Sequence, residues 1–105
     1  MIEAEVIISQ LAKDQICNHV DFIAVDSMTH AIAWESRLMK SIREIGTMAG
    51  SHAMDEDASE RIGSRVHKVV FEGTYLIHYV FDREAKAVYI INFRHGARLP
   101  RKNEP

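Results

Sequence analysis

The sequence has little of several features that would place it in a specialised class. Its only cysteine, Cys17, excludes an intrachain disulfide and fits a reducing compartment. No apolar run approaches the roughly 20 residues that a membrane-spanning helix needs. The N-terminal stretch carries acids where a secretory signal peptide would carry basic residues, so we expect a cytoplasmic protein.

Metal-binding patterns are also missing. The 6 histidines are scattered, and none forms a tight ligand pair with a cysteine or a second histidine, so we expect no zinc site. The acids at 55–57 are consecutive, and no glutamate follows at the offset that a calcium loop requires. The sequence therefore predicts neither a metal nor a cofactor.

Length and composition are those of one ordinary globular domain covering residues 1–105. The chain is 47% hydrophobic and 27% charged, which disfavours general disorder. Its net charge of −2 conceals an asymmetry, because acids dominate the first half and the C-terminal end is basic. That end holds Arg94, Arg98, Arg101 and Lys102 against Glu104 alone. It predicts a local site for an anion or an acidic partner, with a solvated tail as the alternative.

The N-terminal segment predicts a short strand followed by a helix. Residues 3–9 include three consecutive β-branched residues, which favour a strand. Ser9 is a suitable N-cap for a helix over 10–24, where apolar residues recur at three- and four-residue spacing. Cys17 lies beside that apolar face, so we expect it to be a small core residue and not a nucleophile.

A second, longer helix is predicted over 28–48. Asp26 and Ser27 provide a break and a new cap in front of it. Trp34 lies on its apolar stripe and is expected to be a core anchor. Two helices joined so closely must be neighbours, which gives an αα-hairpin.

The C-terminal half predicts a sheet. Three β-rich runs, 65–71, 74–82 and 87–95, are separated by short turn signals, as in an antiparallel meander. In front of them, residues 51–64 are typical of a surface loop, with a short helical turn around 58–61. The predicted element order is β–α–α–β–β–β. This is an α+β fold in which the meander packs on the helical hairpin.

Alternation along the strands assigns side chains to the two faces of the sheet. The face covered by the helices is expected to hold Val66, Val70, Tyr75, Ile77, Tyr79, Phe81, Val88 and Ile90. The polar groups of the strands must reach solvent, a partner or each other, and these are His67, Lys68, His78, Asn92, Arg94 and His95.

Several short patterns follow one another in this half of the chain. They are Arg65, the Gly–x–Tyr–x–Ile–x–Tyr strand at 73–79, the alternating segment 88–93 and the His–Gly–x–Arg sequence at 95–98. In this order the chain resembles the RelE/ParE family of bacterial type II toxins, from about residue 6 to residue 100. The resemblance implies the toxin of a plasmid stabilisation or other toxin–antitoxin system, held silent by a cognate antitoxin protein.

The resemblance leaves two targets open. ParE-like members act by binding and poison DNA gyrase, whereas RelE-like members cleave messenger RNA on the ribosome without a metal. The RelE-like branch has lysines and an arginine at strand positions that hold His67, Val69 and Leu76 here, so only Arg98 matches outright. Because these cations would stabilise the phosphorane, their loss favours the ParE-like branch.

Whether the chain is an enzyme stays open at this point. If it is a metal-independent mRNA endoribonuclease, its catalytic residues are expected to be His95, His67, Lys68 and Arg98. If it acts by binding, the residues that meet the target or the antitoxin are expected to be Arg65, Arg94, Arg98, Arg101 and Lys102. A non-toxic family member that serves as a binding module is the third interpretation. The partners implied are the antitoxin and gyrase, or the ribosome and mRNA, in a homodimer or a toxin–antitoxin hetero-oligomer.

Overall fold

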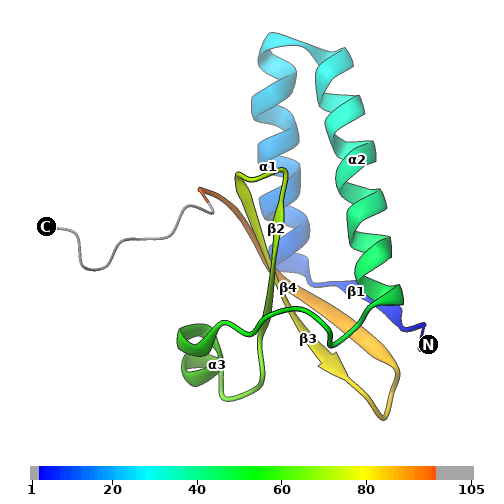
Figure 1. Cartoon of the computed structure of the whole chain (residues 1–105). Helices are drawn as coiled ribbons and strands as arrows, with labels where there is room; N and C mark the ends of the chain where they lie inside the picture. The colour runs from blue at the N-terminus through cyan, green and yellow to red at the C-terminus, as the bar shows by residue number, and fades with distance from the viewer. Residues whose placement is uncertain (1–2, 97–105) are drawn as a thin grey trace, which may run out of the picture.

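The computed structural model describes residues 3–96, which form an α+β fold of three helices and a four-stranded mixed sheet (Figure 1). The helices are α1 (Gln10–Asp26), α2 (Met28–Thr47) and α3 (Glu56–Ile62). The strands are β1 (Glu5–Ile8), β2 (His67–Phe71), β3 (Tyr75–Asp82) and β4 (Ala87–His95). Their order in the sheet is β1-β4-β3-β2, with β1 parallel to β4 and the other pairs antiparallel. The predicted order of strands and long helices is confirmed, with the short α3 added.

A single serine separates the two long helices. The N–H of Ser27 donates to the carbonyl of Ile23 at 3.0 Å and ends α1, while its Oγ accepts from the N–H of His30 at 3.1 Å and begins α2. Ser9 caps α1 in the same way, because its Oγ accepts from the N–H of Ala12 at 3.1 Å. Both predicted caps are therefore confirmed.

The core lies between the hairpin and one face of the sheet. α2 supplies the largest contribution from the helices, namely Trp34, Leu38, Ile42 and Ile45. The sheet supplies buried side chains from its two central strands, namely Ile77, Tyr79, Val88, Ile90 and Phe93. Figure 1 shows that the hairpin continues well beyond the end of the sheet, so its far half has no strand beneath it.

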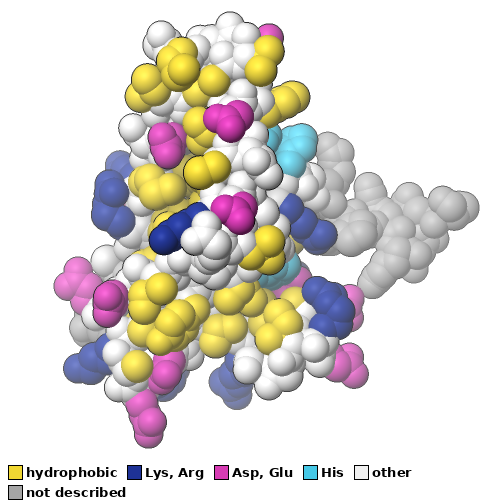
Figure 2. All heavy atoms as spheres, turned by 180° about the vertical axis from the view of Figure 1, so that it is seen from behind, with side chains coloured by type: hydrophobic (Ala, Val, Ile, Leu, Met, Phe, Trp, Pro, Cys, Tyr) yellow, Lys and Arg dark blue, Asp and Glu magenta, His cyan; other side chains and the backbone are white. Residues whose placement is uncertain are grey.

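The apolar side chains of this overhanging half are exposed. Phe22, Val25, Met28 and Ile32 are 70%, 83%, 62% and 58% exposed, respectively. Figure 2 shows apolar side chains gathered at the tip of the hairpin. We call these four residues the hairpin tip.

The last turn of α2 lies directly on Ala4, the residue that leads into β1. The N–H of Ala4 donates to the carbonyl of Gly46 at 2.9 Å. A Cβ on Gly46 would lie 2.7 Å from the carbonyl oxygen of Ala4 and 2.8 Å from Cγ2 of Val6. Only glycine permits so close an approach of helix and strand.

The connection from α2 to β2 pairs with part of the sheet. The N–H of Lys68 donates to the carbonyl of Ala53 at 2.9 Å, and the N–H of Asp55 donates to the carbonyl of Val66 at 2.8 Å. Asp55 also caps α3, since its Oδ1 accepts from the N–H of Ala58 at 3.0 Å. The predicted helical turn is thus a complete short helix, and the segment before it is tied to the outer edge of β2.

Two predictions of burial are wrong. Val70 is 54% exposed, because the turn pairs Phe71 with Tyr75 and puts the odd-numbered residues of β2 and β3 on the same face. The even-numbered Val70 and Val66 therefore alternate to the other face. Cys17 is exposed and not part of the core, because successive helical residues are turned by about 100° from one another, here away from buried Ile16.

Candidate functional site

Two histidines and a tyrosine meet where the end of the sheet lies against α1. Tyr75, the first residue of β3, is the cross-strand partner of His95, the last residue of β4. From α1, the Nε2 of His19 lies 3.0 Å from the hydroxyl of Tyr75. The ring centroid of His95 is 5.5 Å from that of His19 and 5.2 Å from that of Tyr75. We call these three residues the end-of-sheet cluster.

A buried aromatic layer supports this cluster. The Trp34 ring centroid lies 5.3 Å from that of Tyr75 and 5.0 Å from that of His19, and the Phe93 ring stacks on Tyr75 at 5.6 Å. The buried Nε1 of Trp34 meets no acceptor at hydrogen-bonding geometry among the described residues. The layer holds the rings in place, and of the three cluster residues only His95 is exposed.

The protonation states of the end-of-sheet cluster depend on burial and on the charges of neighbouring residues. Burial lowers the pKa of His19 below its ordinary value, and the neighbouring His95 lowers it further. Burial raises the pKa of Tyr75, and the negative charge of Glu72 raises it as well. At neutral pH, His19 and Tyr75 therefore form a neutral hydrogen-bonded pair beneath an exposed histidine.

The structure does not bring together the predicted nuclease residues that it describes. His67 is paired with Tyr79, four residues along β3 from the tyrosine of the end-of-sheet cluster, which is roughly 13 Å by strand rise alone. Lys68, the next residue, points to the opposite face of the sheet. Arg98 lies outside the described residues. The described members of the predicted nuclease set therefore do not share one site; these members are His67, Lys68 and His95.

The two predicted binding residues within residues 3–96, Arg65 and Arg94, are also separated. Arg65 is exposed just before β2, and Arg94 is exposed near the end of β4, on the face away from the hairpin. Because β2 and β4 run in the same direction on either side of β3, these two arginines lie at opposite ends of the sheet. Arg101 and Lys102 lie outside the described residues.

His67 belongs to a structural arrangement at the other end of the sheet. Its Nδ1 donates to the carbonyl of His52 at 2.8 Å, and its ring stacks on Tyr79 at 4.9 Å. The Tyr79 hydroxyl accepts from the N–H of Gly50 at 3.1 Å and lies 2.6 Å from Nδ1 of His52. Burial raises the pKa of Tyr79, and burial followed by the nearby His67 lowers the pKa of His52. These contacts fasten the α2–α3 connection to the sheet.

A chain of polar side chains crosses the sheet from α1 to the start of α3. Gln15 Nε2 donates to Asn92 Oδ1 at 2.8 Å, and Asn92 Nδ2 donates to His78 Nδ1 at 3.0 Å. His78 Nε2 then donates to Asp55 Oδ2 at 2.8 Å. We call Gln15, Asn92, His78 and Asp55 the polar network. It satisfies His78, which is only 4% exposed.

Backbone groups fix the orientation of the polar network from both ends. The N–H of Phe93 donates to Gln15 Oε1 at 2.8 Å, so the amide nitrogen of Gln15 must face Asn92. Asn92 is oriented in turn, which makes His78 Nδ1 an acceptor and its Nε2 a donor. Both ring nitrogens of His78 are therefore occupied, and it is not free to serve as a general base.

The carboxylate at the end of the polar network is held in its ionised form. Partial burial opposes the ionisation of Asp55, but hydrogen bonds from the N–H of Ala58 and from His78 outweigh it. The pKa of Asp55 therefore lies below its ordinary value, with the charge of Lys68 contributing as well.

Sequence reasoning did not single out His19, Asp55 or His52. His19 lies three residues after Ile16, at the margin of the apolar stripe of α1, so its spacing predicts that it faces the sheet. Nothing in that spacing identifies Tyr75 as the residue that it meets. The contact between His78 and Asn92, by contrast, agrees with the expectation that strand polar groups reach each other.

Within residues 3–96, no group of three or more histidine, cysteine, aspartate or glutamate side chains is placed to hold a metal ion. In the same part of the chain, no helix combines the length and the apolar character needed to cross a membrane. No protein-family model matches the chain, and a search of curated proteins finds no significant match. The function must therefore be inferred from the residues and their geometry.

Proposed function

We propose that this chain is the toxin component of a type II toxin–antitoxin system, of the ParE-like branch, and that it acts by binding and not by cleaving a bond. The resemblance in residues 73–79 and 95–98, together with the order of strands and helices, supports the family. We favour the ParE-like branch because the described nuclease candidates lie apart. His67 packs on Tyr79, and Lys68 lies on the opposite face of the sheet. Neither can act together with His95.

Exposed apolar surface supports a neutralising protein partner. The hairpin tip presents Phe22, Val25, Met28 and Ile32 to solvent, on a part of the hairpin that has no strand beneath it. Contiguous apolar surface of this kind is typical of a binding site for another protein. The proposed partner that covers such surface is the cognate antitoxin.

The target proposed for the ParE-like branch is DNA gyrase, and an assay of gyrase supercoiling tests it. The purified chain at micromolar concentration should inhibit supercoiling or trap the cleavage complex. Arg98→Ala should weaken this effect, because Arg98 belongs to the His–Gly–x–Arg sequence on which the resemblance to the family rests at the C-terminal end. Arg43→Ala, which removes an exposed charge from the middle of α2, is the matched control. An unaffected gyrase would contradict the proposed target.

A ribosome-dependent endoribonuclease is the second candidate, and one observation favours it. In the end-of-sheet cluster, a neutral histidine, His19, lies beside an exposed one, His95, and the Tyr75 hydroxyl is 3.0 Å from Nε2 of His19. Two imidazoles so placed could serve as acid and base in attack of a ribose 2′-OH on its phosphodiester.

An assay of mRNA on programmed ribosomes decides between the two candidates. A nuclease should cleave the mRNA, and His95→Ala should abolish cleavage, whereas His30→Ala on the exposed start of α2 should not. Intact mRNA would remove the second candidate. Growth arrest on induced expression, relieved by the product of a neighbouring reading frame, would separate both candidates from a non-toxic binding module.

A further inference from the structure

The edge of the sheet formed by β1 is open at two residues. The N–H groups of Glu5 and Ser9 donate toward β4, both at 2.9 Å. Alternate residues of a strand direct their N–H and C=O groups to the same side, so those of Val6 and Ile8 face outward. No backbone hydrogen bond from another described residue reaches these outward groups. The β1 edge is therefore a strand edge with unused donors and acceptors.

Two helix ends limit this open edge. At its start, the outward N–H of Ala4 is already bonded to the carbonyl of Gly46, in the last turn of α2, at 2.9 Å. At its finish the chain leaves the sheet, because Ser9 is the N-cap of α1. The open edge thus runs from the C-terminal end of α2 to the N-terminal end of α1.

An apolar row crosses the outer face of the sheet and stops at this edge. Ile7 is the cross-strand partner of Tyr89, which is in turn the partner of Val80. Ile7 is 38% exposed and Tyr89 is 36% exposed. Within residues 3–96, no strand lies beyond β1, so Ile7 ends the row without a neighbour on its outer side.

The backbone of the edge is complementary to an antiparallel copy of itself. If Ile7 faces Ile7 of a second copy, Val6 lies opposite Ile8 of that copy, and Ile8 lies opposite its Val6. Each of these two pairings can exchange two hydrogen bonds, because both of its residues have outward groups. A displaced register forms fewer bonds, since Ala4 is already bonded and Gln10 belongs to α1. The same register joins the apolar rows of the two copies through Ile7.

The charges along the edge are complementary in the same register. Glu5 would lie opposite Ser9 of the second copy, beside the first turn of its α1, which contains no acidic residue. A carboxylate is favourable at a helix N-terminus. The last turn of α2 contains no basic residue, and its end beside Ala4 would lie near the same N-terminus of the second copy. Opposite ends of two helix dipoles therefore meet on each side of the two-fold axis.

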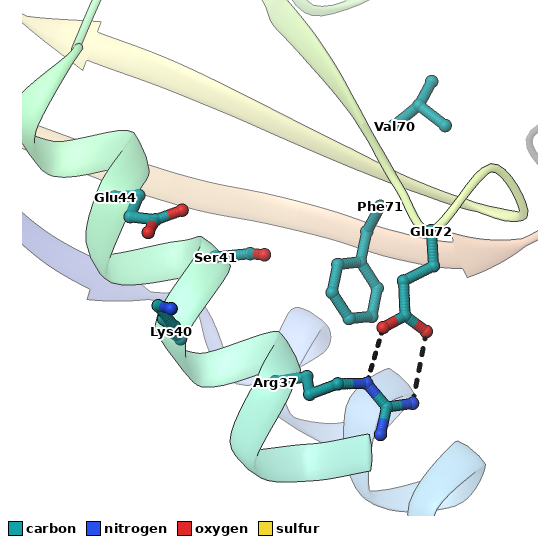
Figure 3. Close-up of a pocket in the computed structure, with 7 residues that line it drawn as sticks. All are labelled: Arg37, Lys40, Ser41, Glu44, Val70, Phe71 and Glu72. Carbon is teal, nitrogen blue, oxygen red and sulfur yellow. Dashed lines mark hydrogen bonds and ion pairs between the residues drawn. The ribbon is translucent and has the colours of Figure 1, made fainter.

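The opposite edge of the sheet does not offer an equivalent surface. On β2 the N–H of Lys68 is bonded to Ala53, so among the described residues only Val70 keeps its outward backbone groups unused. Figure 3 shows that side chains of α2 stand beside this end of β2, where Arg37 and Glu72 form an ion pair with Nε and Oε2 2.6 Å apart. A second copy would gain fewer backbone bonds there and would meet charged side chains.

We propose that the β1 edge binds a second copy of this chain, antiparallel and with Ile7 on the two-fold axis, so that the two four-stranded sheets join into one continuous sheet. The proposed dimer uses neither the hairpin tip nor the end-of-sheet cluster. It therefore does not depend on the proposed toxin function.

Oxidative cross-linking of the full chain tests the register. Facing residues of a non-hydrogen-bonded antiparallel pair have Cα atoms about 4.5 Å apart, which a disulfide can span. In a chain with Cys17→Ser, which removes the exposed native thiol, Ile7→Cys should give a covalent dimer under mild oxidation. Val70→Cys, at a 54% exposed position of the opposite edge, is the matched control and should stay monomeric under the same conditions.

A pair of charge variants tests the two-fold symmetry by sedimentation equilibrium. Ile7→Lys and Ile7→Glu each place like charges opposite one another, so each should weaken dimerisation about tenfold or more. Mixing the two variants should restore association as a 1:1 dimer, which a misfolded chain could not do. Val70→Lys should leave the dimer unchanged.

Several outcomes would overturn the proposal. A wild-type chain that stays monomeric up to about 1 mM leaves the β1 edge to a protein of another sequence. A dimer that survives Ile7→Lys but is lost with Val25→Lys lies on the hairpin tip instead. Equal cross-linking of Ile7→Cys and Val70→Cys, or no association in the mixture of charge variants, would likewise contradict the antiparallel pairing.

Discussion

Asn92 donates a hydrogen bond from Nδ2 to Nδ1 of His78 at 3.0 Å, next to a register shift between β3 and β4. This bond determines which nitrogen of the buried imidazole carries the proton. His78 is therefore held as the tautomer that donates from Nε2 to Asp55. Through these two residues, α1 and the start of α3 are connected across the sheet by side chains alone.

Removal of Asn92 should destabilise the fold. Asn92→Ala leaves the buried Nδ1 of His78 and the amide nitrogen of Gln15 without their partner. We expect the free energy of unfolding to fall by about 1–3 kcal/mol, which is typical of an unsatisfied buried polar group. Urea denaturation measures this change. Asn18→Ala on the exposed surface of α1 is the control and should change stability by less than about 0.5 kcal/mol.

The Asp55 carboxylate should make stability depend on acid pH. Its pKa is lower in the folded chain than its ordinary value of about 3.9, so the unfolded state binds more protons in that range. The stabilisation is present above the unfolded pKa and is lost as the pH falls through the lower folded pKa. Asp55→Asn should flatten the pH dependence of the unfolding free energy below about pH 5. Asp21→Asn, at an exposed position on α1, should leave that dependence intact.

The titration of His19 should respond to His95. His95→Gln removes one of the two causes that lower the pKa of His19, so that pKa should rise but stay below about 6.5, because burial persists. NMR titration of the imidazole Cε1–H follows it directly. His30→Gln, at an exposed position on α2, should leave the pKa of His19 unchanged. An equal response to both variants would contradict the contact between His19 and His95.

The same shift has a consequence for folding. Because the folded chain protonates His19 less readily than the unfolded chain, the unfolded state gains protons first as the pH falls through about 6.5. The contribution of His19 to the free energy of unfolding is therefore lost as the pH falls below about 6.5. The variant with His95→Gln should show a smaller loss.

Gly46→Ala should destabilise the protein although alanine is the better helix former. Helix propensity alone favours alanine by about 1 kcal/mol. The added Cβ would lie 2.7 Å from the carbonyl oxygen of Ala4, a backbone atom of a residue whose N–H is itself bonded to the carbonyl of Gly46. We expect a net loss of about 1–3 kcal/mol in the free energy of unfolding, measured by thermal or urea denaturation. Ser36→Ala, exposed on the same helix, should be neutral or slightly stabilising, and a stabilised Gly46→Ala would refute the close contact.

Local chemistry is enough to predict the helices and the meander of this chain. Ser9 and Ser27 mark the helix starts because a hydroxyl that accepts from the first turn requires no distant residue. Glu72 and Gly73 mark a turn, and both have positive φ, 53° and 69°. The exposed position of His95 at the end of its strand could also be anticipated from its place in the sequence.

Contacts between distant segments could not be predicted in this way. Periodicity assigns a residue to a face but does not identify what covers that face, so neither the pairing of β1 with β4 nor the meeting of His19 with Tyr75 follows from it. The exposure of Val70 depends on how the preceding turn sets the register. Composition places Asp55 in a surface loop, whereas its carboxylate accepts a hydrogen bond from His78 on β3.

The parallel pairing of β1 with β4 joins the strand ahead of the helical hairpin to the last strand of the described sheet in chain order, with Glu5 opposite Ala87. At synthesis rates of about 5–20 residues per second, α1 and α2 leave the ribosome seconds before the strands that cover them. During that interval the helices have only each other and β1 to contact, and most of their apolar surface is open. The emergence of β4 then completes both the sheet and the end-of-sheet cluster, since His95 is its last residue. A chain built in this order makes its helical hairpin well before the strands that cover it, and it forms the end-of-sheet cluster only after β4 has been made.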